Sequence, residues 1–290
     1  MLGKIKNILM TTVLGVSLVG LSGCTAVAEF FEGKYETNTH ELSEAFSAIA
    51  IDSDTADIEL IYSENGESKV VCYQKEKANC EVVVIDGTLT AKAKSSPMNL
   101  FGDKSKITVY LPSVEYTALI VKADTGDIVV PSNFTFESVD ISAETGDITL
   151  NASASGAIKV RTSTGNISVG CEAVDSLDLS ISTGKISVRG ITVAKECKIQ
   201  ADTGNVTLSD STAEKLSVTT DTGKVTLSAC DADELYITTE TGNVTGTLLT
   251  DKVFIVRTST GDIDVPKTIT GGRCEITTDT GDIKISVQAK

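Results

Sequence analysis

The sequence predicts an all-β protein folded as a single parallel β-solenoid, and three observations lead to this prediction. Thr-Gly, followed by Asp, Asn or Lys and then by Ile or Val, occurs nine times at intervals of 19 or 20 residues. Apolar and polar residues alternate on both sides of each glycine, which is the period of a half-buried strand. Aromatic residues make up only 4% of the chain and 23 glycines face 4 prolines, a composition typical of many short strands.

Residues 1–23 resemble the signal peptide of bacterial lipoproteins. Lys4 and Lys6 precede an apolar run over residues 8–20, and Leu-Ser-Gly-Cys follows at residues 21–24. The apolar run is short and rich in Ser, Thr and Gly, which argues against a membrane-spanning helix. The resemblance implies that Cys24 becomes the diacylated N-terminus. We therefore expect an exported protein that is lipid-anchored to the outer face of the bacterial cell membrane.

The segments after the signal peptide are predicted to be a tether and then irregular coils. Residues 24–44 are polar and without period, and we expect a lipid anchor and flexible tether there. Residues 45–121 fit the coil pattern less regularly, with degenerate corners expected at Ala56, Gly87 and Ser105. Asn65-Gly66 lies between two alternating runs, and it predicts a β-hairpin that helps to close the N-terminal end of the stack.

Residues 122–290 are predicted to form regular coils, in one continuous domain with residues 45–121. The nine corner glycines are Gly126, Gly146, Gly165, Gly184, Gly204, Gly223, Gly242, Gly261 and Gly281. Relative to each glycine, positions −7, −5, +2 and +4 are apolar with few exceptions, so each repeat supplies two short strands. Such a unit cannot bury its apolar row alone, whereas stacked units can. We expect about twelve coils in a stack, and we expect the coils to form a right-handed parallel β-helix.

Charge and histidine content exclude several classes of function. The formal net charge is −15, so the surface repels the phosphates of nucleic acids. His40 is the one histidine of the chain, which removes chemistry that needs a histidine base near the repeats or several imidazole ligands. Repeats of 19 or 20 residues leave no room for the long loops of a polysaccharide-cleaving β-helix, and tryptophan is absent. We predict a non-enzymatic protein without a cofactor.

Two rows of residues at the corners are candidates for a functional role, but we expect both rows to be structural. The threonines at position −1 share the parity of the inward row, so we expect them to hydrogen-bond to turn backbone and not to form an ice-binding array. Acidic residues recur at −2 and +1, and stacked carboxylates attract hard cations. Asp124, Asp127, Glu144 and Asp147 are weak candidates for such a cation, although we expect a solvated ladder and no metal site.

Six cysteines remain besides Cys24, and the register separates them into two groups. Cys171, Cys197, Cys230 and Cys274 lie too many coils apart to pair, and we expect small buried hydrophobic side chains. Cys72 and Cys80 flank the irregular N-terminal segment, and the sequence leaves open whether they form a disulfide.

Several motifs together resemble a bacterial domain-of-unknown-function family labelled "putative adhesin". They are the signal-peptide cysteine motif, the opening Phe-Ser-Ala-Ile-Ala-Ile at residues 46–51, Ala-Asp-Ile-Glu-Leu at 56–60, Asp-Gly-Thr-Leu at 86–89, Tyr-Leu-Pro at 110–112 and the Thr-Gly-Asp-Ile repeats. The resemblance covers nearly all of residues 45–290 and implies a β-helix fold. It supplies no catalytic residues.

The function expected from these observations is an adhesin-like binding or scaffolding rod that contacts glycan or protein of the cell envelope. The expected contact face consists of Lys122, Lys159, Arg161, Lys198, Tyr236 and Arg257. The alternatives are an envelope-stress sensor or regulator, acting through the hairpin end, and a polysaccharide-active β-helix enzyme. Residues 274–278 are expected to form an unpaired edge at the last coil, which would allow a tail-to-tail homodimer.

Overall fold

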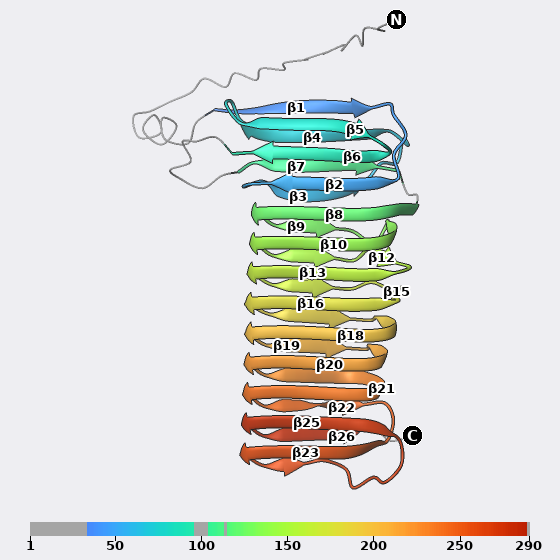
Figure 1. Ribbon diagram of the computed structural model, residues 1–290, viewed down its shortest axis with the longest axis vertical. Helices are drawn as coiled ribbons and strands as arrows, with labels where there is room; N and C mark the ends of the chain where they lie inside the picture. The colour runs from blue at the N-terminus through green and yellow to red at the C-terminus, as the bar shows by residue number, and fades with distance from the viewer. Residues whose placement is uncertain (1–33, 96–103, 113–114, 289–290) are drawn as a thin grey trace, which may run out of the picture.

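The computed structural model describes residues 34–95, 104–112 and 115–288, and these residues form an all-β stack of parallel strands (Figure 1). The predicted fold class, a parallel β-solenoid, is confirmed. Two sheets face each other across the core, and a Thr-Gly corner joins a strand of one to a strand of the other. No described residue belongs to a helix long and apolar enough to cross a membrane. The signal peptide and Cys24 lie outside the described residues.

The first sheet, here called the long-strand sheet, contains the strand that precedes each corner. Its neighbouring strands pair in parallel except for the hairpin β5–β6 at its N-terminal edge. In spatial order the strands are β5 (Asn79–Ile85), β6 (Thr88–Lys94), β2 (Ala48–Ser53), β8 (Glu115–Thr125), β10 (Thr135–Thr145), β13 (Ala157–Thr164), β16 (Ser176–Thr183), β18 (Thr192–Thr203), β20 (Thr212–Thr222), the second part of β21 (Val225–Thr241), β25 (Gly272–Thr280) and β23 (Lys252–Thr260), with β12 (Ser153–Ala154) and β15 (Ala173–Val174) as short extensions.

The second sheet, the short-strand sheet, contains the strand that follows each corner. It too is parallel apart from its two outermost N-terminal strands. In spatial order the strands are β1 (Tyr35–Leu42), β4 (Ser68–Lys75), β7 (Lys106–Leu111), β3 (Asp57–Tyr62), β9 (Ile128–Val130), β11 (Ile148–Leu150), β14 (Ile167–Val169), β17 (Ile186–Arg189), β19 (Val206–Ser209), the first part of β21, β22 (Val244–Leu248), β26 (Ile283–Val287) and β24 (Ile263–Asp264).

One continuous core lies between the two sheets. The alternation seen in the sequence is reproduced coil by coil: Leu119 and Val121 before the first glycine, and Ile128 and Val130 after it, are 0% exposed. Equivalent residues of successive coils are direct partners in the ladders, so each apolar row runs along the stack. This arrangement buries the apolar face that a single repeat leaves open to water.

The corners require glycine because successive coils meet there backbone to backbone. Gly146 has φ +147° and Gly165 has φ +142°, values that side chains with a Cβ rarely adopt. A Cβ on Gly165 would overlap the carbonyl oxygen of Gly146 in the adjacent coil. The same collision recurs along the glycine row, which explains why this residue is repeated at every regular corner.

A cap of strands closes the N-terminal end, and here three expectations are wrong. The described part of the expected tether is mostly strand β1, which pairs antiparallel with β4 along its whole length. The turn at Asn65-Gly66 does not join two paired strands, because β7 lies between β3 and β4. Gly87 is not a coil corner: Asp86 (φ 49°) and Gly87 (φ 73°) form the tight turn of the antiparallel hairpin β5–β6.

Among the described residues the remaining eleven predicted corners are present, so the expected count of about twelve coils is slightly too high. They are Ala56, Ser105 and the nine Thr-Gly corners. Ser105 belongs to this row because its carbonyl oxygen accepts a hydrogen bond from the Asp57 N–H at 3.0 Å. Ten steps between eleven coils correspond to a rod about 48 Å long at the usual strand spacing.

The coils do not stack in chain order at either end. At the N-terminal end, the coil β2–β3 lies between β6–β7 and β8–β9. At the C-terminal end, the coil β25–β26 lies between β21–β22 and β23–β24, and the labels of β21, β25 and β23 in Figure 1 show this order. The expectation that residues 274–278 form a free edge is therefore wrong, since β25 is paired on both sides. The outermost strands at this end are β23 and β24.

Candidate functional site

The candidate site is the outward face of the long-strand sheet, where the register arranges side chains in straight rows. Lys122, Arg161 and Arg257 lie in one row. Lys159, Lys198 and Tyr236 lie in the adjacent row. All six predicted contact residues therefore share this face, but they are spread along the rod: eight ladder steps, or about 38 Å, separate Lys122 from Arg257. They form an extended surface and not a compact pocket.

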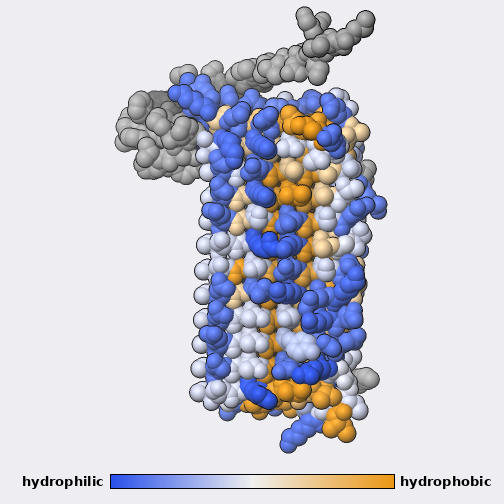
Figure 2. All heavy atoms as spheres, viewed as in Figure 1, coloured by the Kyte–Doolittle hydropathy of each residue, from blue (hydrophilic) through white to orange (hydrophobic). Residues whose placement is uncertain are grey.

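Cationic side chains lie mainly in the rows of this face that are farther from the corner, although the chain as a whole is acidic. The three outward rows farther from the corner contain seven cationic and five acidic side chains, whereas the outward row at position −2 of the same strands adds six acids and no cation. Within one row Asp140, Lys159, Asp178 and Lys198 follow each other on adjacent strands. The space-filling view shows polar side chains spread across this side of the stack (Figure 2).

Tyr236 is the centre of a compact group near the C-terminal end of the face, here called the tyrosine cluster. Its hydroxyl donates to the Glu234 carboxylate at 3.1 Å. The Lys215 Nζ lies 5.9 Å from the ring centroid and the Arg273 guanidinium carbon lies 5.7 Å from it, both at cation–π distances. The tyrosine cluster comprises Glu196, Lys215, Glu234, Tyr236, Arg273 and Glu275.

Ion pairs hold the two cations of the tyrosine cluster. Lys215 pairs with Glu196 at 2.9 Å and Arg273 with Glu275 at 2.6 Å. Hydrogen bonding to these carboxylates raises the pKa of both cations, so they stay charged at neutral pH. The sequence predicts Tyr236 as a contact residue but does not predict Arg273. Arg273 lies beside the Tyr236 ring only because β25 is inserted next to β21.

The acidic row at position +1 joins neighbouring corners. The Asp127 carboxylate accepts the backbone N–H of Asp147 at 2.8 Å, and Asp147 in turn accepts that of Asn166 at 2.8 Å. At the other end Asp282 accepts the N–H of Asp262 at 3.0 Å, and this bond lowers the pKa of the Asp282 carboxyl group. A carboxylate or amide oxygen at +1 thus fixes the next coil, which gives the repeated Asp and Asn a structural role.

The weak cation candidates are not assembled into a ligand set. Asp124, Asp127, Glu144 and Asp147 lie on the corner edge, where one carboxylate oxygen of Asp127 and of Asp147 is used by backbone. Within the described ranges, the one group of three His, Cys, Asp or Glu residues with converging ligand atoms lies elsewhere, in the N-terminal cap.

The threonine row differs from the expectation. All nine threonines at position −1, from Thr125 to Thr280, are exposed, so their predicted inward orientation is wrong. The buried threonines at −3 make the corner hydrogen bonds instead: Thr162 donates to the Gly146 carbonyl at 3.4 Å and Thr278 to that of Gly242 at 3.1 Å. The exposed row is one residue wide and is flanked by charged rows, so it is not the broad flat array that ice binding needs.

The cysteines fall into the two groups that the register indicates. Cys171, Cys197, Cys230 and Cys274 are free and buried, as predicted. Burial raises the pKa of Cys197 and of Cys274 to about 12, which keeps these thiols protonated and unreactive at neutral pH. Cys72 and Cys80, whose pairing the sequence leaves open, form a disulfide that joins β4 of one sheet to β5 of the other.

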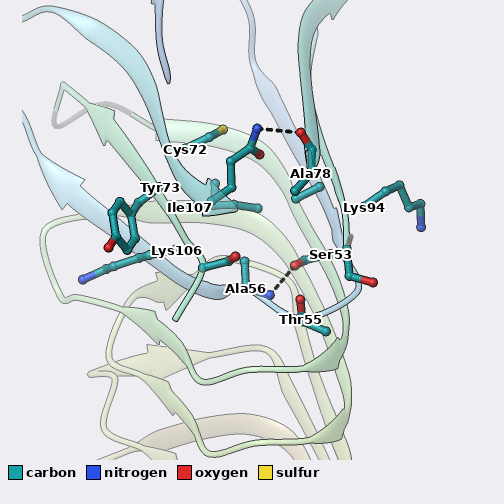
Figure 3. Close-up of a pocket in the computed structure, with 13 residues that line it drawn as sticks. Ser53, Thr55, Ala56, Cys72, Tyr73, Ala78, Lys94, Lys106 and Ile107 are labelled. Carbon is teal, nitrogen blue, oxygen red and sulfur yellow. Dashed lines mark hydrogen bonds between the residues drawn. The ribbon is translucent and has the colours of Figure 1, made fainter. Parts of the chain in front are cut away.

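A small cavity lies between the N-terminal cap and the first corner (Figure 3). Its volume is about 10 Å³, and Ala56, Cys72, Gln74 and Ile107 contribute to its lining. This volume suits about one water molecule and is far too small for a sugar ring. Burial lowers the pKa of nearby His40, so its imidazole is neutral at pH 7.

The comparisons with known proteins give one family match and several solved structures of low sequence identity. The model of the Toastrack DUF4097 family matches residues 46–195 and 171–290. No curated protein matches the sequence. Among solved structures, a "putative adhesin" from Bacteroides fragilis is 15% identical, with a TM-score of 0.44, 88% of this chain covered and 97% of the other. A "putative adhesin" from Parabacteroides distasonis is 14% identical, with a TM-score of 0.43 and coverages of 88% and 98%. A "putative lipid binding protein" from Parabacteroides distasonis is 14% identical, with a TM-score of 0.42 and coverages of 87% and 97%.

Proposed function

The chain belongs to the Toastrack DUF4097 family, as its motifs indicate, and from that premise we propose that it is a non-enzymatic, adhesin-like binding rod of the bacterial cell surface. Its ligand is a glycan or protein of the envelope, contacted through the outward face of the long-strand sheet. The observation that carries the proposal is that seven cations lie in the three rows of this face farther from the corner, in a chain that is acidic as a whole. Attachment to the outer face of the cell membrane through lipidated Cys24 is part of the same proposal.

The charge distribution favours an anionic ligand for this face. A polyanion is repelled by the carboxylates of the corner edge and meets its least unfavourable potential over Lys122, Lys159, Arg161 and Lys198. Exposed charge pairs are individually weak, at about 0 to 1 kcal/mol each. Rows that repeat at the strand spacing allow many such contacts to form at once, so an extended polymer gains affinity through multivalency.

The surroundings of the carboxylates support a role without catalysis. Glu196, Glu234 and Glu275 are each engaged by a cation or a hydroxyl of the tyrosine cluster. Glycoside cleavage needs two acids across a scissile bond, one of them with a raised pKa, and a cleft that holds the sugar. Among the described coils from β8 to β22, the outward face is an open sheet surface without long loops between the coils.

Reversal of two charges at the middle of the face is expected to weaken binding. The double variant Lys159→Glu and Arg161→Glu should bind envelope fragments and the polyanionic glycan polygalacturonate about tenfold more weakly, because two contacts of roughly 0.5 to 1 kcal/mol are lost and repulsion is added. Binding of the immobilised soluble domain is measured at several salt concentrations, and the parent should lose affinity as salt rises.

A matched control changes the same charges on another surface. Lys185→Glu with Lys224→Glu places two acids on the corner edge and alters the net charge equally. We expect this control to bind nearly as well as the parent. Equal weakening of both variants would mean that only net charge matters, and unchanged binding by the Lys159/Arg161 variant would show that the face is wrong.

We also propose that two copies associate through the C-terminal end of the rod, although not through the strand expected from the sequence. The outermost coil leaves Val253, Ile263 and Ile269 exposed at 38%, 46% and 90%. Phe254 and Val256, which continue the core rows, are only partly buried there. Apolar surface is visible at this end in Figure 2. The N-terminal end is covered by its cap strands, so this asymmetry favours tail-to-tail contact between edges.

The mass of the soluble domain in solution tests this association. Light scattering over a range of concentrations should show a dimer, and Ile263→Asp should shift it to monomer because a charge replaces apolar contact. Ile120→Asp, which alters an exposed isoleucine on the side of the rod, is the control and should remain dimeric. Monomer mass alone for the parent at high concentration would reject the dimer.

A further inference from the structure

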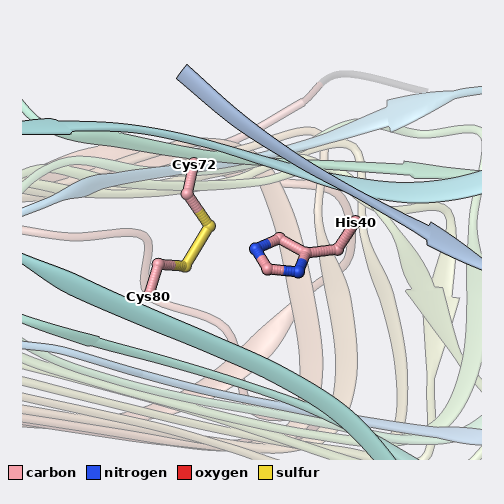
Figure 4. A group of neighbouring side chains, drawn as sticks. All are labelled: His40, Cys72 and Cys80. Carbon is pink, nitrogen blue, oxygen red and sulfur yellow. A yellow bond between two sulfur atoms is a disulfide. The ribbon is translucent and has the colours of Figure 1, made fainter. Parts of the chain in front are cut away.

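The N-terminal cap brings together three side chains that could hold a metal ion. His40 is on β1, Cys72 on β4 and Cys80 on β5, so three separate strands contribute. One ligand atom of each residue lies within 4.8 Å of the other two. Figure 4 shows the imidazole directed toward the disulfide. The group is far from the outward face of the regular coils and takes no part in the function proposed above.

Two polar atoms near this group are buried without a hydrogen-bond partner. They are the Nε2 atom of His40 and the Oε1 atom of Gln74. The amide nitrogen of Gln74 donates to the Ala78 carbonyl at 3.0 Å, so only its oxygen is unused. Buried polar atoms without partners are rare, and each one calls for an explanation. A disulfide is a poor acceptor and donates nothing, so the oxidised cap does not explain the His40 nitrogen.

We propose that reduction of the Cys72–Cys80 disulfide opens a site for one thiophilic divalent cation, of which Zn²⁺ is the representative, with Cys72, Cys80 and His40 as its protein ligands. The reductant is a dithiol: it is oxidised to its own disulfide while Cys72 and Cys80 become two thiols. Metal binding then displaces the two thiol protons to solvent, and both thiolates bind the ion. In the oxidised cap the sulfur ligands are used by each other and the site is closed.

The ligand types and their surroundings suit such an ion. Two thiolates and one imidazole favour zinc over the hard cations magnesium and calcium, which take oxygen ligands. Three protein ligands leave one position of a tetrahedral zinc ion for water. The cavity of about 10 Å³ that both Cys72 and Gln74 line has the volume of one water molecule. The unpartnered Gln74 oxygen supplies an acceptor for a water molecule there.

Titration of the full soluble chain with Co²⁺ tests the site, because sulfur-to-cobalt charge-transfer absorption reports thiolate ligation. The protein is reduced with a dithiol, desalted without oxygen and compared with the oxidised protein. The reduced chain should bind one equivalent of Co²⁺, and Zn²⁺ should displace it. The oxidised chain should bind no Co²⁺ with this absorption. Failure of the reduced chain to bind either ion would overturn the proposal.

Variants separate this site from the other cysteines. Cys72→Ser with Cys80→Ser should abolish the absorption, and His40→Ala should weaken Co²⁺ binding at least tenfold. Cys171→Ser with Cys230→Ser removes two buried thiols from the regular coils and should leave the titration unchanged. If His40→Ala lowers the strand signal in circular dichroism, His40→Gln replaces it as a bulkier variant. Binding by the His40 variant as tight as the parent's, or loss of binding only in the Cys171/Cys230 variant, would refute the assignment.

Discussion

Replacement of Gly165 by alanine is expected to destabilise the protein by about 3 to 5 kcal/mol. Gly165 has φ +142°, and its Cβ would overlap the carbonyl oxygen of Gly146 in the adjacent coil. The overlapping atom is backbone and cannot rotate away, so the ladder between two coils must separate. In a chain of this length that loss lowers the melting temperature by roughly 10 °C.

Equilibrium denaturation in guanidinium chloride measures this effect, with Gly190→Ala as the control. Gly190 also has positive φ, +65°, but a Cβ placed there meets no atom within 4 Å. Alanine at this position should lower the free energy of unfolding by about 1 kcal/mol, which is the cost of the left-handed backbone conformation alone. If both variants lost the same stability, contact between corner backbones would not be the reason for the glycine row.

Replacement of Lys252 by methionine has the second largest expected effect, a loss of about 2 to 4 kcal/mol. Lys252 is 3% exposed, and its ammonium pairs with the Asp231 carboxylate, which is 16% exposed. The same ammonium donates to the Thr250 hydroxyl at 2.8 Å. Removing the cation leaves a largely buried carboxylate that still accepts the Ala232 N–H at 2.9 Å but has lost its counter-charge, and an uncompensated buried charge is costly.

Thermal denaturation of three variants distinguishes this explanation from loss of packing. Lys252→Met with Asp231→Asn should recover most of the stability, because no buried charge remains. Lys195→Met breaks an ion pair with Asp175 at 3.0 Å whose lysine is 69% exposed, and it should cost less than about 0.5 kcal/mol. A double variant no more stable than Lys252→Met would contradict the role assigned to the buried charge.

The regular coils could be predicted because one local sequence pattern indicates the positions of both the strands and the corners. Alternation identifies the inward positions, and a glycine in each repeat marks the corner, where the backbones of adjacent coils meet. The N-terminal cap could not be read in this way. Asn65-Gly66 and Asp86-Gly87 are equally good turn signals, and only the insertion of β7 beside β4 decides that the second forms the hairpin.

The spatial order of the coils could not be predicted from the sequence for a related reason. Every coil presents the same apolar rows, so the ladder between β21 and β25 satisfies the pattern as well as one between β21 and β23 would. The candidate face follows from register alone and could be predicted. The tyrosine cluster could not, because it depends on coil order. The threonine row was misassigned because alternation ends before the corner, where positions −2 and −1 are both exposed.

The inserted coils at the two ends limit how far this rod can be treated as modular. In a simple solenoid the last repeat can be removed and the stack becomes shorter by one unit. Here, deletion of β25 and β26 would leave an empty layer between β21–β22 and β23–β24, which must close before the ladders re-form. Lengthening or shortening of this scaffold is therefore best done among the coils from β8 to β20, where neighbours in sequence are also neighbours in space.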